Sequence, residues 1–181
     1  QEEFISIFLN GRGQPGMGPL PPGIFGYQDG EPGINPVVYK WKDGAPQRRS
    51  VSEAKALLVK AGWPDGRDAK TGRPLVLNLD TTSGGLGDKS TMDWMSRQLS
   101  QVGVQLVVRS TDFNRFQEKL RKGSAQLYFL GWNADYPDPE NFFFLYYSKN
   151  FPPVGKNISR YKNPEFEAFF EKMATMENSP E

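Results

Sequence analysis

The sequence contains no cysteine and no histidine among its 181 residues. The lack of cysteine excludes disulfides and thiolate metal sites, and it suits an exported protein as well as a cytosolic one. The lack of histidine removes the commonest general base, the Ser-His-Asp and Cys-His triads and most zinc catalysis. Carboxylate- or lysine-based enzymes stay open, but the composition favours a protein that is not an enzyme and that has no metal and no cofactor.

An excess of one charge and a long apolar run are also missing. The 22 basic and 21 acidic residues are interleaved and give a net charge of +1. This balance provides no basic stripe for nucleic acid. No apolar run approaches the roughly 18 residues of a membrane span. The chain opens Gln1-Glu2-Glu3 rather than with a signal peptide, which is uninformative if it is a piece of a longer protein.

The remaining composition is that of a globular domain. Hydrophobic residues make up 37%, and the 19 glycines close the gap to the usual apolar share. A chain of this length suits one domain of roughly 100–200 residues. Aromatic residues reach 13%, which indicates a core of large side chains or an aromatic binding surface. We therefore predict a single domain over residues 1–181.

The middle of the chain alternates between strand and helix patterns. We predict strands at residues 75–79, 104–108 and 126–130, with helices at residues 90–102 and 113–122. A capping box at Ser50–Glu53 opens an earlier helix. Ser90 with Asp93 is the predicted cap of the helix at 90–102, and Asp112 that of the helix at 113–122, whose apolar face we expect to contain Phe113, Phe116 and Leu120. The β-α-β-α-β order predicts an α/β fold, with parallel pairing and right-handed crossovers.

The two ends and the segment before residue 50 have other patterns. Glu2–Asn10 resembles the last turns of a helix, and Asn163-Pro164 begins another, whose apolar stripe is Phe166, Phe169, Phe170 and Met173. Both ends look cut, so we expect a piece of a longer protein. Residues 11–49 are rich in Gly and Pro and predict a long arm that either lies over the surface or faces a ligand.

The glycine-rich stretch Ser83–Thr91 follows a predicted strand and precedes a predicted helix, which is the context of a phosphate-binding loop. The spacing fails, because Ser83 and Asp88 stand where a P-loop needs glycine. A carboxylate at Asp88 would also repel phosphate. We therefore predict a flexible βα loop without a nucleotide.

Three carboxylates cluster at Asp135, Asp138 and Glu140. Paired carboxylates can hydrolyse glycosides or bind calcium, but the prolines around them favour a rigid turn. We expect Asp138 and Glu140 to have structural roles, such as accepting hydrogen bonds from nearby backbone N–H groups. Asp135 differs because it follows the third predicted strand, where ligands of open α/β sheets bind. Beside Trp132, its carboxylate can pair a ligand ammonium against an aromatic wall.

Two other features favour structural interpretations. The aromatic run at residues 142–147 is too short for a membrane span and predicts a buried helical turn. Asn157-Ile158-Ser159 matches a glycosylation acceptor, which a bacterial protein would not normally use.

The segment Gly131-Trp132-Asn133-Ala134-Asp135-Tyr136-Pro137-Asp138-Pro139 resembles the extracellular solute-binding proteins of family 5, the oligopeptide and dipeptide receptors of ABC importers. Three further stretches resemble the same family in the same order. They are residues 10–27 with their Gly and Pro pattern, residues 54–64 ending in Ala61-Gly62-Trp63-Pro64, and Tyr161-Lys162-Asn163-Pro164-Glu165-Phe166.

This resemblance implies a periplasmic-binding-protein-like lobe, with a β-α-β-α-β core in a mixed sheet flanked by helices. The chain would be most of the C-terminal lobe, without the N-terminal lobe and the C-terminal tail. It implies that Asp135 pairs with the α-ammonium of a peptide and that Trp132 lines the cleft, with Asn133 and Tyr136 beside them. The implied partners are a peptide and the ABC permease of the inner membrane, for a monomeric periplasmic or lipid-anchored receptor.

One position departs from the family. Phe129 stands where some peptide binders have an arginine that helps to hold the ligand, so the resemblance implies neither a peptide length nor that contact. The alternatives are a receptor of the same type for an oligosaccharide or another solute, with Trp132 stacked on a sugar ring, and a hydrolase that uses Asp135 with Asp138 or Glu140.

Overall fold

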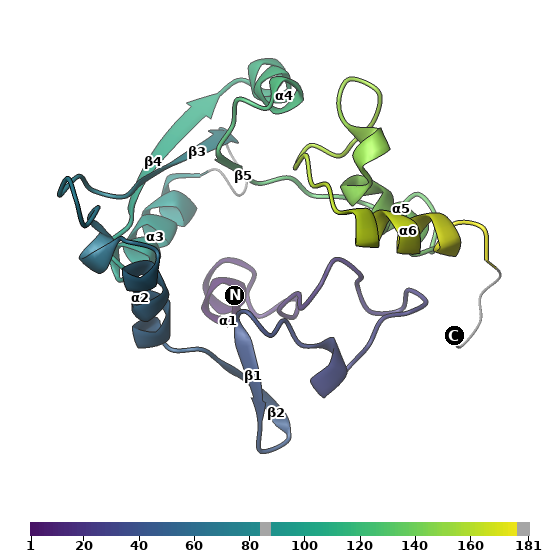
Figure 1. Cartoon of the computed structure of the whole chain (residues 1–181), viewed down its shortest axis with the longest axis horizontal. Helices are drawn as coiled ribbons and strands as arrows, with labels where there is room; N and C mark the ends of the chain where they lie inside the picture. The colour runs from purple at the N-terminus through teal and green to yellow at the C-terminus, as the bar shows by residue number, and fades with distance from the viewer. Residues whose placement is uncertain (84–87, 177–181) are drawn as a thin grey trace. The chain divides into compact units, whose positions relative to one another are not determined.

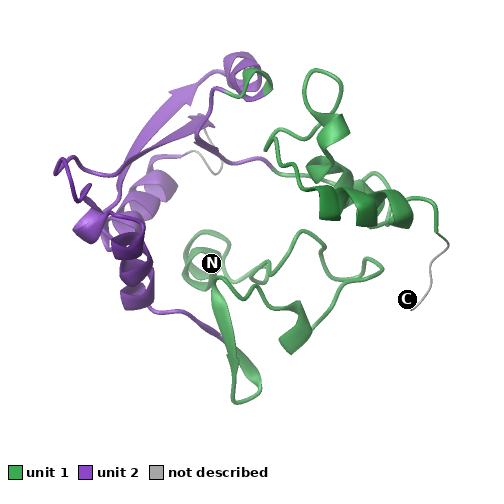
Figure 2. Ribbon diagram, viewed as in Figure 1, with its two compact units in different colours: residues 1–46, 121–123, 131–181 green, residues 47–120, 124–130 purple. Residues whose placement is uncertain are grey.

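The computed structural model describes residues 1–83 and 88–176, which form two compact units (Figure 2). Unit 1 comprises residues 1–46, 121–123 and 131–181, and unit 2 comprises residues 47–120 and 124–130. The prediction of one domain that is a lobe of a longer protein stays a prediction. The predicted α/β class is confirmed, because strands and helices alternate through unit 2.

Unit 2 contains a three-stranded parallel sheet in the order β4-β3-β5 (Figure 1). Its strands are β3 (Val76–Thr82), β4 (Gln105–Thr111) and β5 (Leu127–Tyr128). The helices are α2 (Val51–Lys60), α3 (Lys89–Ser100) and α4 (Phe113–Lys122), and the turn η2 (Pro64–Gly66) follows α2. Parallel neighbours require crossover connections, and α3 and α4 supply them here.

All three predicted strands exist, but their limits differ. The ladder between β3 and β4 continues through the pairs Asp80–Arg109 and Thr82–Thr111. Both strands are therefore longer than predicted, because backbone pairing extends past the apolar residues that marked them in the sequence. The strand predicted at residues 126–130 is shorter, since only Leu127 and Tyr128 pair with β3.

The core of unit 2 consists of buried residues from the sheet and its two helices, namely Leu79, Met92, Val104, Phe116 and Leu120. The predicted face of Phe113, Phe116 and Leu120 is present on α4, but Phe113 does not contribute to the core. Phe113 is the first residue of α4 and is 64% exposed.

An ion pair lies among these apolar residues. The Asp80 carboxylate on β3 is 1% exposed, and Lys119 Nζ on α4 lies 2.5 Å from its Oδ1. A buried carboxylate needs a partner of opposite charge, because desolvation without one is costly. The pair therefore links α4 to the central strand of the sheet.

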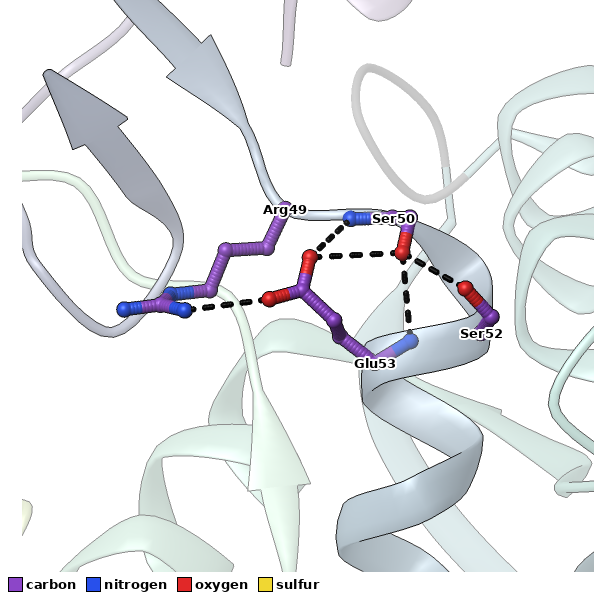
Figure 3. Close-up of polar contacts among 4 residues, drawn as sticks. All are labelled: Arg49, Ser50, Ser52 and Glu53. Atoms are coloured by element: carbon purple, nitrogen blue, oxygen red, sulfur yellow. Dashed lines mark hydrogen bonds and ion pairs between the residues drawn. The ribbon is translucent and has the colours of Figure 1, made fainter. Parts of the chain in front are cut away.

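Helix α2 begins at the predicted capping box (Figure 3). The Ser50 hydroxyl accepts a hydrogen bond from the Glu53 backbone N–H at 3.2 Å, and the Glu53 carboxylate accepts one from the Ser50 N–H at 3.0 Å. The Arg49 guanidinium lies 3.2 Å from the same carboxylate. These bonds satisfy N–H groups that the first helical turn leaves without partners.

The predicted cap of α3 is wrong in its residue. The N-cap is Asp88 rather than Ser90, and its carboxylate accepts from the Thr91 backbone N–H at 2.9 Å and from the Ser90 hydroxyl at 2.8 Å. These bonds, the Thr91 N–H first, lower the pKa of Asp88. The rest of the glycine-rich loop, residues 84–87, lies outside the described residues, so the predicted βα loop stays a prediction. The predicted cap of α4 is confirmed, since Asp112 accepts from the Arg115 N–H at 3.0 Å.

Two glycines bring two turns of unit 2 into backbone contact. Gly66 and Gly103 both have positive φ angles, of 70° and 81°. A Cβ atom on Gly66 would lie 2.0 Å from the Gly103 carbonyl oxygen. Glycine is required here both for the backbone conformation and for the close approach.

Unit 1 contains few regular elements. Its helices are α1 (Glu2–Phe8), α5 (Glu140–Phe143) and α6 (Pro164–Met173), with single turns η1 (Glu31–Gly33), η4 (Phe144–Tyr146) and η5 (Ser148–Asn150). A two-stranded hairpin of β1 (Tyr39–Lys42) and β2 (Ala45–Arg48) lies within the arm predicted at residues 11–49, and the last two residues of β2 belong to unit 2. The buried Tyr39 donates its hydroxyl to Glu2 at 2.7 Å, which ties the hairpin to α1.

The aromatic run at residues 142–147 is half-buried and packs against α6. Phe143 and Tyr146 make edge-on contacts with Phe166, and Tyr147 contacts Phe170 at a ring-centroid distance of 4.7 Å. The predicted helical turn and its packing role are therefore confirmed, but the run is half-buried rather than buried. The stripe predicted for α6 is only partly right, because Phe170 is buried whereas Phe169 is 67% exposed.

Asn157 is fully buried and holds an irregular loop of unit 1. Its amide nitrogen donates to the carbonyls of Tyr147 and Tyr161 at 3.1 and 2.9 Å. Its amide oxygen accepts from the Ser159 hydroxyl at 2.8 Å. Both amide hydrogens of Asn157 are thus engaged inside the fold, so its amide nitrogen is not accessible for glycosylation.

No helix in residues 1–83 and 88–176 is long and apolar enough to cross a membrane.

Candidate functional site

The predicted site residues lie on one irregular segment of unit 1. Residues 131–139 form no helix or strand, and α5 begins directly after them at Glu140. Trp132 is half-buried, whereas Asn133, Asp135 and Tyr136 are exposed. The structure thus places all four on one short stretch of chain, and their position relative to the sheet of unit 2 stays a prediction.

Asn141 connects two of these residues. It is the second residue of α5 and is 3% exposed. Its amide oxygen accepts a hydrogen bond from the indole Nε1–H of Trp132 at 3.0 Å and another from the backbone N–H of Asp135 at 3.1 Å. One buried carbonyl oxygen therefore fixes both the indole ring and the backbone that carries the carboxylate.

The geometry of Trp132 limits what it can offer a ligand. Its ring packs edge-on against Phe144, with a centroid distance of 5.2 Å and an interplanar angle of 65°. The indole has one hydrogen-bond donor and no acceptor, and that donor is taken by Asn141. Trp132 can therefore contribute its apolar ring surface and the negative potential of its π face.

The side chain of Asp135, unlike that of Trp132, has a polar group that is not engaged by the described residues. Its backbone N–H is engaged, but its exposed carboxylate forms no hydrogen bond or ion pair with the described residues. The exposed Asn133 forms none with them either. Asp135 thus presents a negative charge on a fixed backbone, which can bind a cation or a hydrogen-bond donor.

The other two carboxylates of the cluster have partners within the segment. Asp138 accepts a hydrogen bond from the Glu140 backbone N–H at 2.8 Å, which confirms its predicted structural role. The Tyr136 hydroxyl donates to the Glu140 carboxylate. This bond raises the pKa of Tyr136, while the Asn141 side chain acts in the opposite direction. Tyr136 therefore stays a neutral phenol at physiological pH.

An apolar groove adjoins the segment within unit 1. It encloses about 720 Å³, and its wall includes Tyr136, Phe143, Phe169 and Met173. Phe25 of the Gly- and Pro-rich arm also lines it, so this part of the arm lies against the surface of its own unit. The exposure of Phe169, which the sequence did not predict, is explained by its place on this wall.

The described parts of both units contain no group of His, Cys, Asp or Glu side chains that could hold a metal ion. In particular, the arrangement of Asp135, Asp138 and Glu140 does not form the calcium site considered from the sequence. The sequence analysis did not single out Asn141, whose bonds reach residues six and nine positions earlier in the chain.

The chain has recognisable relatives. A family model described as the middle part of the bacterial extracellular solute-binding proteins, family 5, matches residues 1–152. Di/tripeptide-binding protein 4 of Pseudomonas aeruginosa is 28% identical over 168 residues, which cover 92% of this chain and 28% of that protein. Heme-binding protein A of Haemophilus influenzae is 25% identical over 184 residues, which cover 100% of this chain and 30% of that protein.

Solved structures show the same fold. The periplasmic binding protein DppA of Helicobacter pylori, in complex with the peptide STSA, superposes with a TM-score of 0.73 at 24% identity. The match covers 94% of this chain and 29% of that one. This chain thus spans less than a third of the length of each of these three proteins.

Proposed function

The chain belongs to the bacterial extracellular solute-binding proteins of family 5, and from that premise we propose that it is part of a receptor for peptides. In this proposal the chain forms most of one lobe of a longer protein that closes on its ligand by a hinge motion. The receptor passes the peptide to an ABC permease in the inner membrane. We expect it to be a monomer in the periplasm, free or lipid-anchored.

The observation that carries this proposal is the pairing of Trp132 and Asp135 around one buried amide. The carboxylate of Asp135 has no partner among the described residues, whereas the polar atom of Trp132 is already satisfied. A free carboxylate beside an apolar ring suits an ammonium group, which binds an anion through charge-assisted hydrogen bonds. The α-ammonium of a peptide is such a group, and the first side chain of the peptide follows it.

Two of the relatives named above are a di/tripeptide-binding protein and a haem-binding protein. Haem is recognised mainly through its apolar ring and its iron, and its propionates are anions, which the Asp135 carboxylate would repel. The site therefore favours peptide over haem. An oligosaccharide remains the alternative, because carboxylates and aromatic rings also bind sugars.

The arrangement of the carboxylates supports binding without catalysis. Hydrolysis by the alternative route needs two carboxylates that both face the substrate. Asp138 is engaged with the Glu140 backbone, and Glu140 is engaged with Tyr136. Neither is poised as a partner for Asp135.

The test is calorimetric titration of the full-length protein with trialanine and with N-acetyl-trialanine. We expect the free peptide to bind and the acetylated peptide to bind far more weakly, because acetylation removes the ammonium charge. Asp135→Asn should weaken binding of the free peptide by about 2–5 kcal/mol, the usual cost of breaking a charge pair that binding buries. The same substitution should change binding of the acetylated peptide much less.

Two results would count against the proposal. Equal affinity for free and acetylated peptide would remove the ammonium from the recognition. Undiminished affinity in Asp135→Asn would mean that another group holds the peptide, as a sugar-type site would allow, because an amide still hydrogen-bonds hydroxyls.

A further inference from the structure

We propose that Asn141 is a positioning residue, which sets the distance and angle between the aromatic wall and the carboxylate of the ligand site. This inference rests on the proposed function, since it concerns the same site. It extends that function to a residue that does not itself face the ligand.

The first argument is that the amide oxygen of Asn141 accepts two hydrogen bonds. An amide oxygen has two lone pairs, and in Asn141 one receives the Trp132 indole N–H and the other the Asp135 backbone N–H. A single amide oxygen thus contacts two of the four residues assigned to the site.

The second argument is the lack of regular secondary structure in the segment. Residues 131–139 belong to no helix or strand, so no backbone ladder fixes them. The indole donor of Trp132 and the N–H of Asp135 would lose their partner if the amide were removed. Because buried donors without acceptors cost free energy, the segment would rearrange to expose them.

The third argument is the anchoring of Asn141 itself. It lies on α5, and it is 3% exposed. Its neighbours in sequence pack against α6 through Phe143 and Phe166. The aromatic cluster therefore fixes the helix that carries the amide, and the amide oxygen faces residues 131–139.

The chemistry predicts which substitutions are tolerated. Asn141→Asp keeps an oxygen that can accept from both Trp132 and Asp135. Asn141→Leu has a similar volume and no acceptor. Asn157→Leu is the matched control, because Asn157 is an equally buried asparagine of unit 1 that bonds neither Trp132 nor Asp135.

The first readout needs no ligand. Hydrogen exchange is followed by NMR at the Trp132 indole N–H, which is assigned among the four tryptophans by its disappearance in Trp132→Phe. All variants are compared at a temperature where circular dichroism shows them folded. We expect protection of the indole in wild type and in Asn141→Asp, its loss in Asn141→Leu, and its retention in Asn157→Leu.

The second readout is calorimetric titration of the full-length protein with trialanine. We expect Asn141→Leu to weaken binding by roughly 10- to 100-fold, the loss typical when a group that orients a binding side chain is removed. Asn141→Asp should recover part of that loss, and Asn157→Leu should bind as wild type does while it is folded.

Unchanged indole protection in Asn141→Leu would overturn the inference, and so would loss of protection without any loss of affinity. Equal weakening by Asn157→Leu would reduce the effect to general destabilisation and would also overturn it. If wild type does not bind trialanine, the proposed function fails, and the exchange result alone decides whether Asn141 organises the segment.

Discussion

The two units are stabilised in different ways. In unit 2, backbone groups bond to one another along the parallel ladder, and side chains cap the helices or pair in the core. In unit 1, much of the backbone is irregular, and two buried asparagines supply bonds that a ladder would supply elsewhere. Buried backbone groups must be satisfied in both cases, so the less regular unit depends more on individual side chains.

This difference has a functional side. A binding site needs side chains in orientations that regular elements do not provide, and irregular segments provide them if something fixes the backbone. Asn141 and Asn157 do this at two places in unit 1. In unit 2, the comparable buried polar contact is the ion pair of Asp80 with Lys119, which joins a helix to the sheet.

The largest effect is expected in unit 2, at its buried ion pair. Lys119→Met leaves the Asp80 carboxylate buried without its partner, and we expect a loss of about 3–5 kcal/mol in the free energy of unfolding. Because Lys119 is 28% exposed, we expect a loss at the lower end of this range. Urea denaturation of the chain measures the loss.

The double variant Asp80→Leu/Lys119→Met removes both charges and should regain most of that stability. Lys89→Met is the matched control, because the pair of Lys89 with Asp93 is exposed and should be worth less than about 1 kcal/mol. Equal losses for the two lysine variants would show that burial does not matter at Asp80.

The next effect is expected in unit 1, at the buried asparagine of its irregular loop. Asn157→Ala removes the side-chain donor to the Tyr161 carbonyl and one of two donors to the Tyr147 carbonyl, which keeps the Asn150 N–H. We expect a loss of about 1–3 kcal/mol. Thermal denaturation measures it, with the exposed Asn133→Ala as the control that should change little. A loss no greater than that of Asn133→Ala would remove the contrast drawn between the units.

The smallest effect is expected at the cap of α2. Ser50→Ala removes the hydroxyl that accepts from the Glu53 N–H, and we expect a loss of about 1 kcal/mol. Ser52→Ala is the control, since the Ser52 hydroxyl lies 2.7 Å from the Ser50 hydroxyl (Figure 3) and is not part of the capping box. A similar melting temperature for the two variants would mean that the ion pair of Glu53 with Arg49, rather than the capping box, holds the end of the helix.

Local signals in the sequence predicted much of unit 2. The caps at Ser50 and Asp112 and the alternation of strands with helices were right, because they depend on neighbouring residues. The cap of α3 was assigned to Ser90 instead of Asp88, since several polar residues in a row compete for that role. The polar ends of β3 and β4 were missed because backbone pairing, rather than residue type, extends them.

The site was predicted unevenly. Trp132 and Asp135 were singled out through their motif and their order in the chain, and their role in binding stays a prediction. The structural role of Asp138 was found through the prolines beside it. Asn141 was missed, and Asn157 was noticed only as a glycosylation-like sequence. Both act through bonds to residues whose proximity depends on the folded loop, and a linear pattern does not encode that proximity.

The most direct test of the peptide-receptor account is native mass spectrometry of the full-length protein, purified without denaturation beside its Asp135→Ala variant. The account predicts a heterogeneous set of co-purified peptides on the wild type and their loss from the variant. Haem or a sugar on the wild type, or peptides retained by the variant, would contradict it.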